Sequence, residues 1–165
     1  MPQATLIIGV GNEYRGDDGI GPAVIRALAG TQPAGVGMVV QAGEALALIN
    51  AWVDAERVIL IDAVAARGTP GKMYRIDASK TPLPAHFLAC STHDFGVAAA
   101  IELARTIGLL PPHVILYGIE GQDFAPGAGL SSPIARVVHT VAARVTQEVC
   151  LARKQSSGSV QVDAS

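Results

Sequence analysis

Three short segments of the sequence carry acidic or imidazole side chains where an apolar run gives way to polar residues. They are Gly16-Asp17-Asp18-Gly19, Ile61-Asp62-Ala63 and Ser91-Thr92-His93. Carboxylate oxygens and a neutral imidazole nitrogen are suitable ligands for borderline divalent metals such as nickel and zinc. A single acid or histidine is more often a helix cap or a surface residue. Taken together, the segments predict a metal site built from an acid of the first pair, Asp62 and His93.

The elements that must position these side chains are predicted from hydrophobic periodicity. Apolar runs rich in β-branched residues are typical of strands buried on both faces. A weaker alternating segment, Gly71–Ile76, predicts an edge strand. The buried strands are expected at Ala4–Val10, Gly37–Val40, Val58–Ile61 and His113–Ile119.

Helices are expected between these runs, because apolar residues recur there at helical spacing in sets that begin at Ile20, Val97 and Ile134. A shorter helix is expected at Ala45–Ala51. The alternation of strands and helices predicts an α/β fold, a single-domain three-layer sandwich with a twisted, mostly parallel sheet and helices on both faces. Ligands of such sheets bind at the carboxyl ends of the strands, where all three polar segments fall.

The third segment is expected to start a helix. Ser91 or Thr92 would be its N-cap, and His93 would lie in the first turn. The positive end of the helix dipole disfavours imidazolium, so this position favours a neutral imidazole that is available as a ligand.

Length and composition restrict the number of domains and the classes of partner. The chain has 165 residues, half of them hydrophobic, which suits one domain, expected over 1–153. The polar, serine-rich end predicts a disordered tail over 154–165. Lys plus Arg number 12 against 14 Asp plus Glu, a balance that argues against nucleic acid as a partner.

The apolar run near the N-terminus is too short for a signal peptide or a membrane span, so a cytoplasmic protein without membrane contact is expected. Cys90 and Cys150 are far apart in different expected elements and predict two free thiols. We also expect a monomer with no organic cofactor.

Four pieces of the chain, in this order and spacing, resemble the hydrogenase maturation proteases. They are Gly9-Val10-Gly11-Asn12 through Gly21, Ile61-Asp62-Ala63, Ser91-Thr92-His93 with Phe95-Gly96, and Tyr117-Gly118-Ile119-Glu120 with Gly129-Leu130-Ser131. The resemblance implies that the metal ligands are Asp18, Asp62 and His93, which are also the candidate catalytic residues. Many members have Asp-Gly-Gly after the second strand, whereas this chain has Gln41-Ala42-Gly43-Glu44 and lacks that Asp, so its role in the family is not assigned to Glu44.

The resemblance further implies an endopeptidase of the aspartic type that removes the C-terminal extension of a nickel-loaded [NiFe]-hydrogenase large-subunit precursor. The nickel would be supplied mainly by that precursor, which is the expected partner. Glu120 and Asp123, after the last expected core strand, are candidates for substrate binding or ordinary loop acids. Water would attack a peptide carbonyl polarised by the metal or by a nearby acid.

Other functions fit the sequence less well. A dinucleotide-binding loop would need glycine where Tyr14 stands, and the His and Asn of peptidyl-tRNA hydrolases are missing after the similar Gly-Asn opening. A cysteine hydrolase would pair Cys90 with His93, although a free cysteine is more often buried. The main alternative is a nickel-dependent binding or chaperone module for hydrogenase assembly that docks without cutting.

Overall fold

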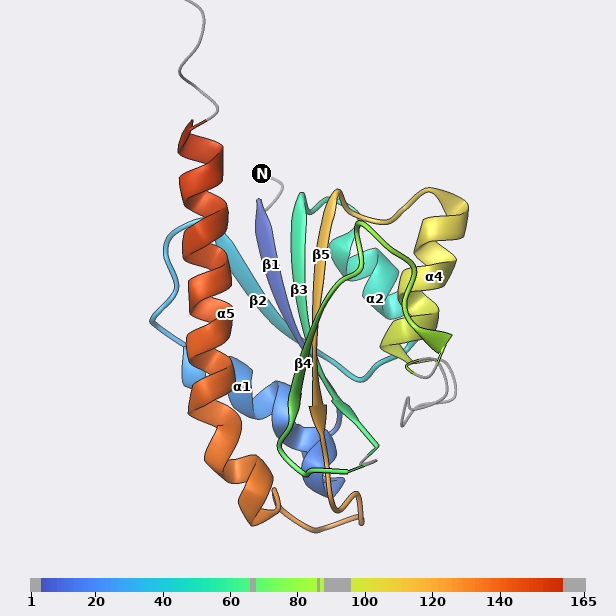
Figure 1. The fold of residues 1–165 in the computed structure, drawn as a ribbon, viewed down its shortest axis with the longest axis vertical. Coiled ribbons are helices and arrows are strands. Elements are labelled where there is room, and N and C mark those ends of the chain that lie inside the picture. Colours follow the sequence, from blue (N-terminus) through green and yellow to red (C-terminus); the bar gives the residue numbers. More distant parts are fainter. Residues whose placement is uncertain (1–3, 66–67, 86, 88–95, 159–165) are drawn as a thin grey trace, which may run out of the picture.

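Five strands form one sheet in the order β2-β1-β3-β5-β4. The computed structural model describes residues 4–65, 68–85, 87 and 96–158. β2, β1, β3 and β5 run parallel, and β4 pairs with β5 in the antiparallel direction at the edge (Figure 1). The strands are β1 (Thr5–Val10), β2 (Val36–Gln41), β3 (Arg57–Val64), β4 (Met73–Asp77) and β5 (His113–Glu120).

Helices cover both faces of this sheet. α1 and α5 lie on one face, and α2 and α4 lie on the other (Figure 1). A short 3-10 helix, η1, precedes α1 directly. The bounds are η1 (Gly16–Gly19), α1 (Ile20–Leu28), α2 (Ala45–Trp52), α4 (Val97–Ile107) and α5 (Ser132–Gly158). The predicted three-layer α/β fold with a mostly parallel sheet is confirmed.

Alternation along the central strands divides the core into two layers. In β3, Val58 and Leu60 pack toward α2 and α4, whereas Ile59 and Ile61 pack toward α1 and α5. Trp52 and Ile101 fill the first layer, and both are fully buried. This alternation also fixes the face on which each polar side chain near the strand ends lies.

Three features of the fold differ from the sequence prediction. β2 is an edge strand and is only partly buried, so it is not buried on both faces. α5 continues to Gly158, so the tail predicted from residue 154 is wrong for 154–158, and residues 159–165 lie outside the described part. α4 begins at Val97, later than expected. Among the described helices, none combines the length and the apolar composition that a membrane span requires.

Candidate active site

The glycines of the opening segment serve the packing of α1 on β1. A Cβ added to Gly9 would lie 2.5 Å from the carbonyl oxygen of Gly21, and one added to Gly21 would lie 2.4 Å from the carbonyl oxygen of Val10. Helix and strand backbones therefore touch directly, which only glycine permits. This contact holds the start of α1, and η1 before it, at the carboxyl end of the sheet.

Gly11 determines where Asp18 lies. Its φ of +134° is in the region that favours glycine, and an added Cβ would lie 1.9 Å from the carbonyl oxygen of Asp18. The Asn12 amide donates a hydrogen bond of 2.7 Å to Oδ2 of Asp18. Asp18 is only 2% exposed, so its carboxylate is held against the end of β1.

Asp62 lies near the end of β3, the strand next to β1 in the sheet. It is 4% exposed and shares the alternation of Val58 and Leu60, so its side chain lies on the face covered by α2 and α4. β3 also contacts η1, the short helix that carries Asp18. The structure thus brings two of the predicted ligands, Asp18 in η1 and Asp62 in β3, to the same edge of the sheet.

Asp17 has a different role from Asp18. Its carboxylate is fully buried and accepts hydrogen bonds from the amides of Gln122 and Asp123 at 2.7 and 2.9 Å. The amide and the hydroxyl of Ser131 also donate to it, at 2.7 and 2.8 Å. Asp17 therefore fastens the loop between β5 and α5 to η1. Sequence reasoning missed this role, because its partners lie more than a hundred residues away along the chain.

The environment of Asp17 keeps it ionised. Burial alone would raise its pKa, but the amides of Asp123, Gln122 and Ser131 and the Ser131 hydroxyl together hold the pKa below the ordinary value for Asp. Neither acid of the pair caps α1 through its side chain, since Gly19 occupies the N-cap position without a side-chain hydrogen bond. A simple capping explanation of Asp17 and Asp18 is therefore wrong.

Glu120 is the last residue of β5 and is buried, so it is not part of a loop. The Tyr74 hydroxyl donates to one of its carboxylate oxygens at 2.6 Å, and the Thr69 amide donates to the other at 2.9 Å. The hydrogen bond from Tyr74, followed by the one from Thr69, holds the pKa of Glu120 below its usual value. These contacts tie the segment before β4 to β5.

The second candidate for substrate binding, Asp123, is exposed in the loop after β5. Its carboxylate accepts the Ala125 amide at 2.9 Å, while its backbone bonds to Asp17. Glu44, which stands where many family members have the Asp-Gly-Gly stretch, is exposed directly before α2. Cys150 is a free, exposed thiol, as predicted, and Cys90 lies outside the described residues.

His93, the third predicted ligand, also lies outside the described residues. α4 begins at Val97 with Gly96 as its N-cap residue, so the start expected for this helix was too early. Within the described ranges, no group of three acidic, His or Cys side chains is placed to hold a metal ion.

Buried acids concentrate at this edge of the sheet. The described part of the chain contains four of them, Asp17, Asp18, Asp62 and Glu120, and every one lies in η1 or near the carboxyl end of β3 or β5. Asp17 and Glu120 hold loops through several hydrogen bonds each. A buried carboxylate is costly unless it is bonded or functional, so this clustering makes the carboxyl edge of the sheet the candidate site.

Comparison with known proteins identifies the family of the chain. The family model for hydrogenase maturation proteases matches residues 22–148, more than half of the chain. This chain belongs to the hydrogenase maturation protease family. It is an endopeptidase, and the alternative of a module that docks without cutting is not supported.

Individual relatives match most of the chain. The hydrogenase expression/formation protein HupD of Rhodobacter capsulatus is 27% identical over 153 residues, which cover 90% of this chain and 72% of that protein. The hydrogenase 2 maturation peptidase of a Thaumarchaeota archaeon superposes with a TM-score of 0.65 at 27% identity, covering 88% of this protease and 97% of that chain. Escherichia coli HybD, a hydrogenase maturating endopeptidase, shares the fold with a TM-score of 0.71 at 23% identity over 93% of each chain.

Proposed function

We propose that this protease acts on a [NiFe]-hydrogenase large-subunit precursor, recognises the nickel that the precursor carries, and removes the precursor's C-terminal extension. Asp18, Asp62 and His93 bind that nickel when the two proteins dock. The nickel is part of the substrate, so a precursor whose metal centre is empty is not processed. The observation that carries the proposal is the pair of buried carboxylates at one edge of the sheet, Asp62 near the end of β3 and Asp18 in η1, bonded to the Asn12 amide just after the neighbouring strand β1.

The chemistry of these side chains suits the metal. Carboxylate and imidazole donors bind nickel and other borderline divalent ions. Asp62 lies near the end of β3, and the Asp18 carboxylate is bonded to the Asn12 amide just beyond the end of the adjacent strand β1. Adjacent strand ends are about 4.8 Å apart, which brings carboxylates held there within reach of one ion. His93 precedes the first residue of α4 by four positions, and Val97 packs in the core layer on the same face as Asp62. An extended stretch of that length spans at most about 14 Å.

Asp17 and Glu120 contribute structure to this site. Each accepts hydrogen bonds from groups that connect separate segments, and each has a lowered pKa. Hydrolysis then requires water to attack the carbonyl carbon of the scissile peptide, with the C–N bond breaking and the amine leaving with a proton. Asp18 and Asp62, the two acids nearest to the bound nickel in this proposal, are the candidates for handling that proton.

The test uses Asp18→Asn and Asp62→Asn, which keep the side-chain shape and remove the charge. Asp54→Asn is the matched control, because Asp54 is an exposed acid after α2. Each protein is incubated with nickel-loaded precursor, and the truncated product is weighed by mass spectrometry. We expect the two site variants to lose on the order of 100-fold or more in rate, and the control to cleave normally. Near wild-type cleavage by either site variant in its folded form would remove that residue from the nickel site.

A further inference from the structure

The outer edge of β4 offers backbone groups that no described strand uses. The Ala78 amide donates to the carbonyl of Val114 at 2.9 Å, and the Glu120 amide donates to the carbonyl of Lys72 at 2.9 Å, so even-numbered residues of this segment face β5. In an antiparallel pair, the alternate residues direct N–H and C=O the other way. Those residues are Met73, Arg75 and Asp77.

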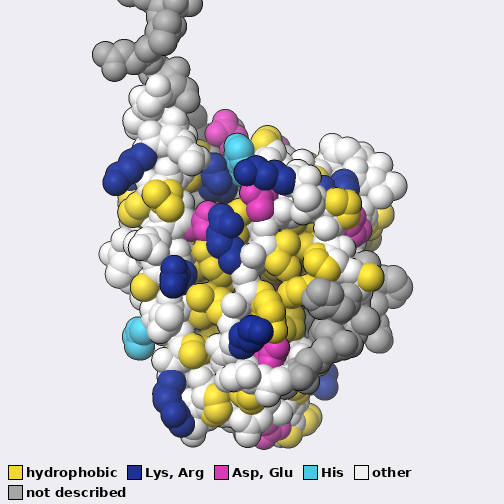
Figure 2. All heavy atoms as spheres, viewed as in Figure 1, with side chains coloured by type: hydrophobic (Ala, Val, Ile, Leu, Met, Phe, Trp, Pro, Cys, Tyr) yellow, Lys and Arg dark blue, Asp and Glu magenta, His cyan; other side chains and the backbone are white. Residues whose placement is uncertain are grey.

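A cavity of about 310 Å³ adjoins this edge, between β4 and α5. The side chains of Met73 and Arg75 line it from β4, and Tyr117 and Leu151 add apolar surface. Figure 2 looks onto this face, where hydrophobic side chains gather and are bordered by Lys and Arg. The cavity therefore lies where alternate side chains of a strand added to β4 would project.

The charged wall of the cavity is already ordered. Arg75 donates to both carboxylate oxygens of Glu148, at 2.8 and 2.7 Å, and the Tyr117 hydroxyl donates to Glu148 at 2.7 Å. Burial and the hydrogen bond to Glu148 raise the pKa of Tyr117 to about 12, so it stays a donor. Arg144, on α5, lines the same cavity and forms no ion pair with another described residue. Its positive charge is available to an acidic group of a ligand.

The sheet register gives the position of the β4 edge relative to Asp62 of the proposed nickel site. Tyr74 pairs with Gly118, and Gly118 pairs with Asp62. A strand added outside β4 would lie three strand spacings from β3, about 14 Å, which about four extended residues can span. Because β4 is antiparallel to β5, its first residue, Met73, lies at the carboxyl edge of the sheet, and Asp77 lies away from it.

We propose that the C-terminal extension of the precursor binds along the free edge of β4 as an additional strand, parallel to β4, with alternate side chains in the cavity beside α5. This inference rests on the proposed function, since it takes the extension as the occupant. Backbone hydrogen bonds to Met73, Arg75 and Asp77 supply affinity that does not depend on sequence, and the cavity selects side chains that are apolar or acidic. The extension is thereby held taut beyond the scissile bond.

Proline substitution tests the edge directly. Met73→Pro removes an outward amide and places a ring where the added strand must approach, while the pairing of β4 with β5 is kept. Val40→Pro is the matched control at the opposite edge of the sheet. The Gly11 amide donates to the carbonyl of Gln41, so Val40, one residue earlier, directs its amide away from β1.

We expect Met73→Pro to lower kcat/KM for nickel-loaded precursor at least about tenfold, mainly through KM, and Val40→Pro to stay within about twofold of wild type. Wild-type cleavage by folded Met73→Pro would overturn the inference and leave the proposed function intact. The same result would mean that Lys72 and Arg75 serve only to protect an edge strand from aggregation.

Amide hydrogen exchange on the wild-type protease tests the same inference without a substitution, so it can be used even if Met73→Pro does not fold. The probe is a synthetic peptide with the sequence of the extension. The amides of Met73, Arg75 and Asp77 are expected to gain at least about tenfold protection, whereas those of Tyr74 and Ile76 are already protected by β5. Unchanged exchange at all three outward amides with saturating peptide would refute the inference. Because the peptide carries no nickel, this outcome is independent of whether Asp18, Asp62 and His93 bind the metal.

Discussion

The Asp17 carboxylate gives the most quantitative prediction from the structure. In Asp17→Asn, the remaining carbonyl oxygen can keep the hydrogen bonds from Gln122, Asp123 and the Ser131 hydroxyl, but the new NH₂ group faces the Ser131 amide, donor against donor. One charge-assisted hydrogen bond, worth about 1.5–3 kcal/mol, is lost, and the others become weaker without the charge. We therefore expect the free energy of unfolding to fall by about 3 kcal/mol.

For a chain of this length, that loss corresponds to a Tm lowered by about 6–12 °C. Asp123→Asn is the control, because the exposed Asp123 side chain bonds only to the Ala125 amide, and it is expected to cost less than about 1 kcal/mol. Thermal melts followed by circular dichroism give both numbers. A Tm for Asp17→Asn within about 2 °C of wild type would refute the assignment of Asp17 as the residue that fastens this loop.

The stability that the Asp17 carboxylate contributes to the wild-type protein is expected to depend on pH. The pKa of Asp17 is lowered in the folded state, because the amides of Asp123, Gln122 and Ser131 outweigh the effect of burial. Its ionised form therefore stabilises the fold above the ordinary Asp pKa of about 3.9, and this stabilisation is lost as pH falls through the lower folded value. The stability gap between wild type and Asp17→Asn should be full at neutral pH and shrink below pH about 4.

The remaining predictions concern single positions. Gly11→Ala should displace Asp18 and abolish cleavage in a protein that still folds, because the added Cβ would lie 1.9 Å from the Asp18 carbonyl oxygen; retained cleavage would contradict this. Ile101→Ala should cost about 2–5 kcal/mol in a melt, since Ile101 is fully buried, whereas His93→Ala should stop precursor cleavage with a much smaller shift. Glu120→Gln should lower the free energy of unfolding by about 1–3 kcal/mol and leave the cleavage rate of the folded protein unchanged. A slower cleavage with an unchanged Tm would instead support a role of Glu120 in substrate binding.

Several elements of the fold follow directly from the sequence. β1, β3 and β5 are apolar runs with every position, or nearly every position, buried, and this pattern is typical of central parallel strands. β4 was predicted as an edge strand from its weaker alternation. Its antiparallel direction depends on pairing with β5, which no local pattern of residues reveals.

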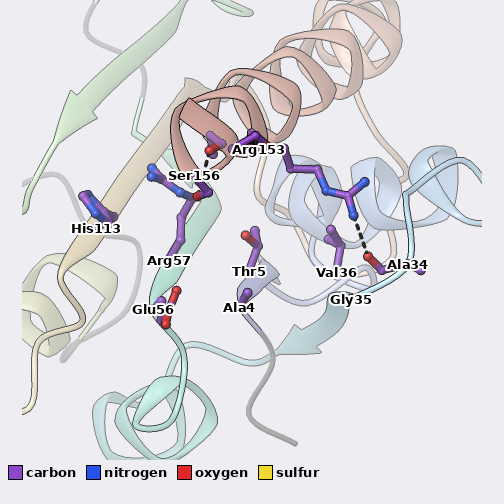
Figure 3. A pocket seen from close by; sticks show the side chains of 12 residues that line it. Ala4, Thr5, Ala34, Gly35, Val36, Glu56, Arg57, His113, Arg153 and Ser156 are labelled. Carbon is purple, nitrogen blue, oxygen red and sulfur yellow. Dashed lines mark hydrogen bonds between the residues drawn. The ribbon is translucent and has the colours of Figure 1, made fainter. Parts of the chain in front are cut away.

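The end of α5 shows why composition misleads at a terminus. Residues 154–158 are polar and were expected to be unstructured, but they continue a helix whose Ala152 is buried. Arg153 donates to the carbonyl of Ala34 at 3.1 Å and Ser156 to that of Ala152 at 3.2 Å, beside a cavity at the amino end of the strands (Figure 3). These contacts depend on the loop before β2, which is distant in the sequence.

The candidate site was predictable in part. The strand-end positions of Asp18 and Asp62 follow from where the apolar runs stop, and the structure places both at one edge. The different roles of Asp17 and Asp18 could not be predicted, because the hydrogen-bond partners of Asp17, which are Gln122, Asp123 and Ser131, are distant in the sequence. Glu120 was expected in a loop because the strand before it continues one residue further than its last apolar position.

In the proposed function, processing depends on the nickel in the substrate. The most direct measurement incubates the wild-type protease with the same precursor in nickel-loaded and nickel-free forms and weighs the products by mass spectrometry over time. We expect the C-terminal extension to be released only from the nickel-loaded form. Equal release from both forms would contradict the proposal that Asp18, Asp62 and His93 recognise the nickel of the precursor.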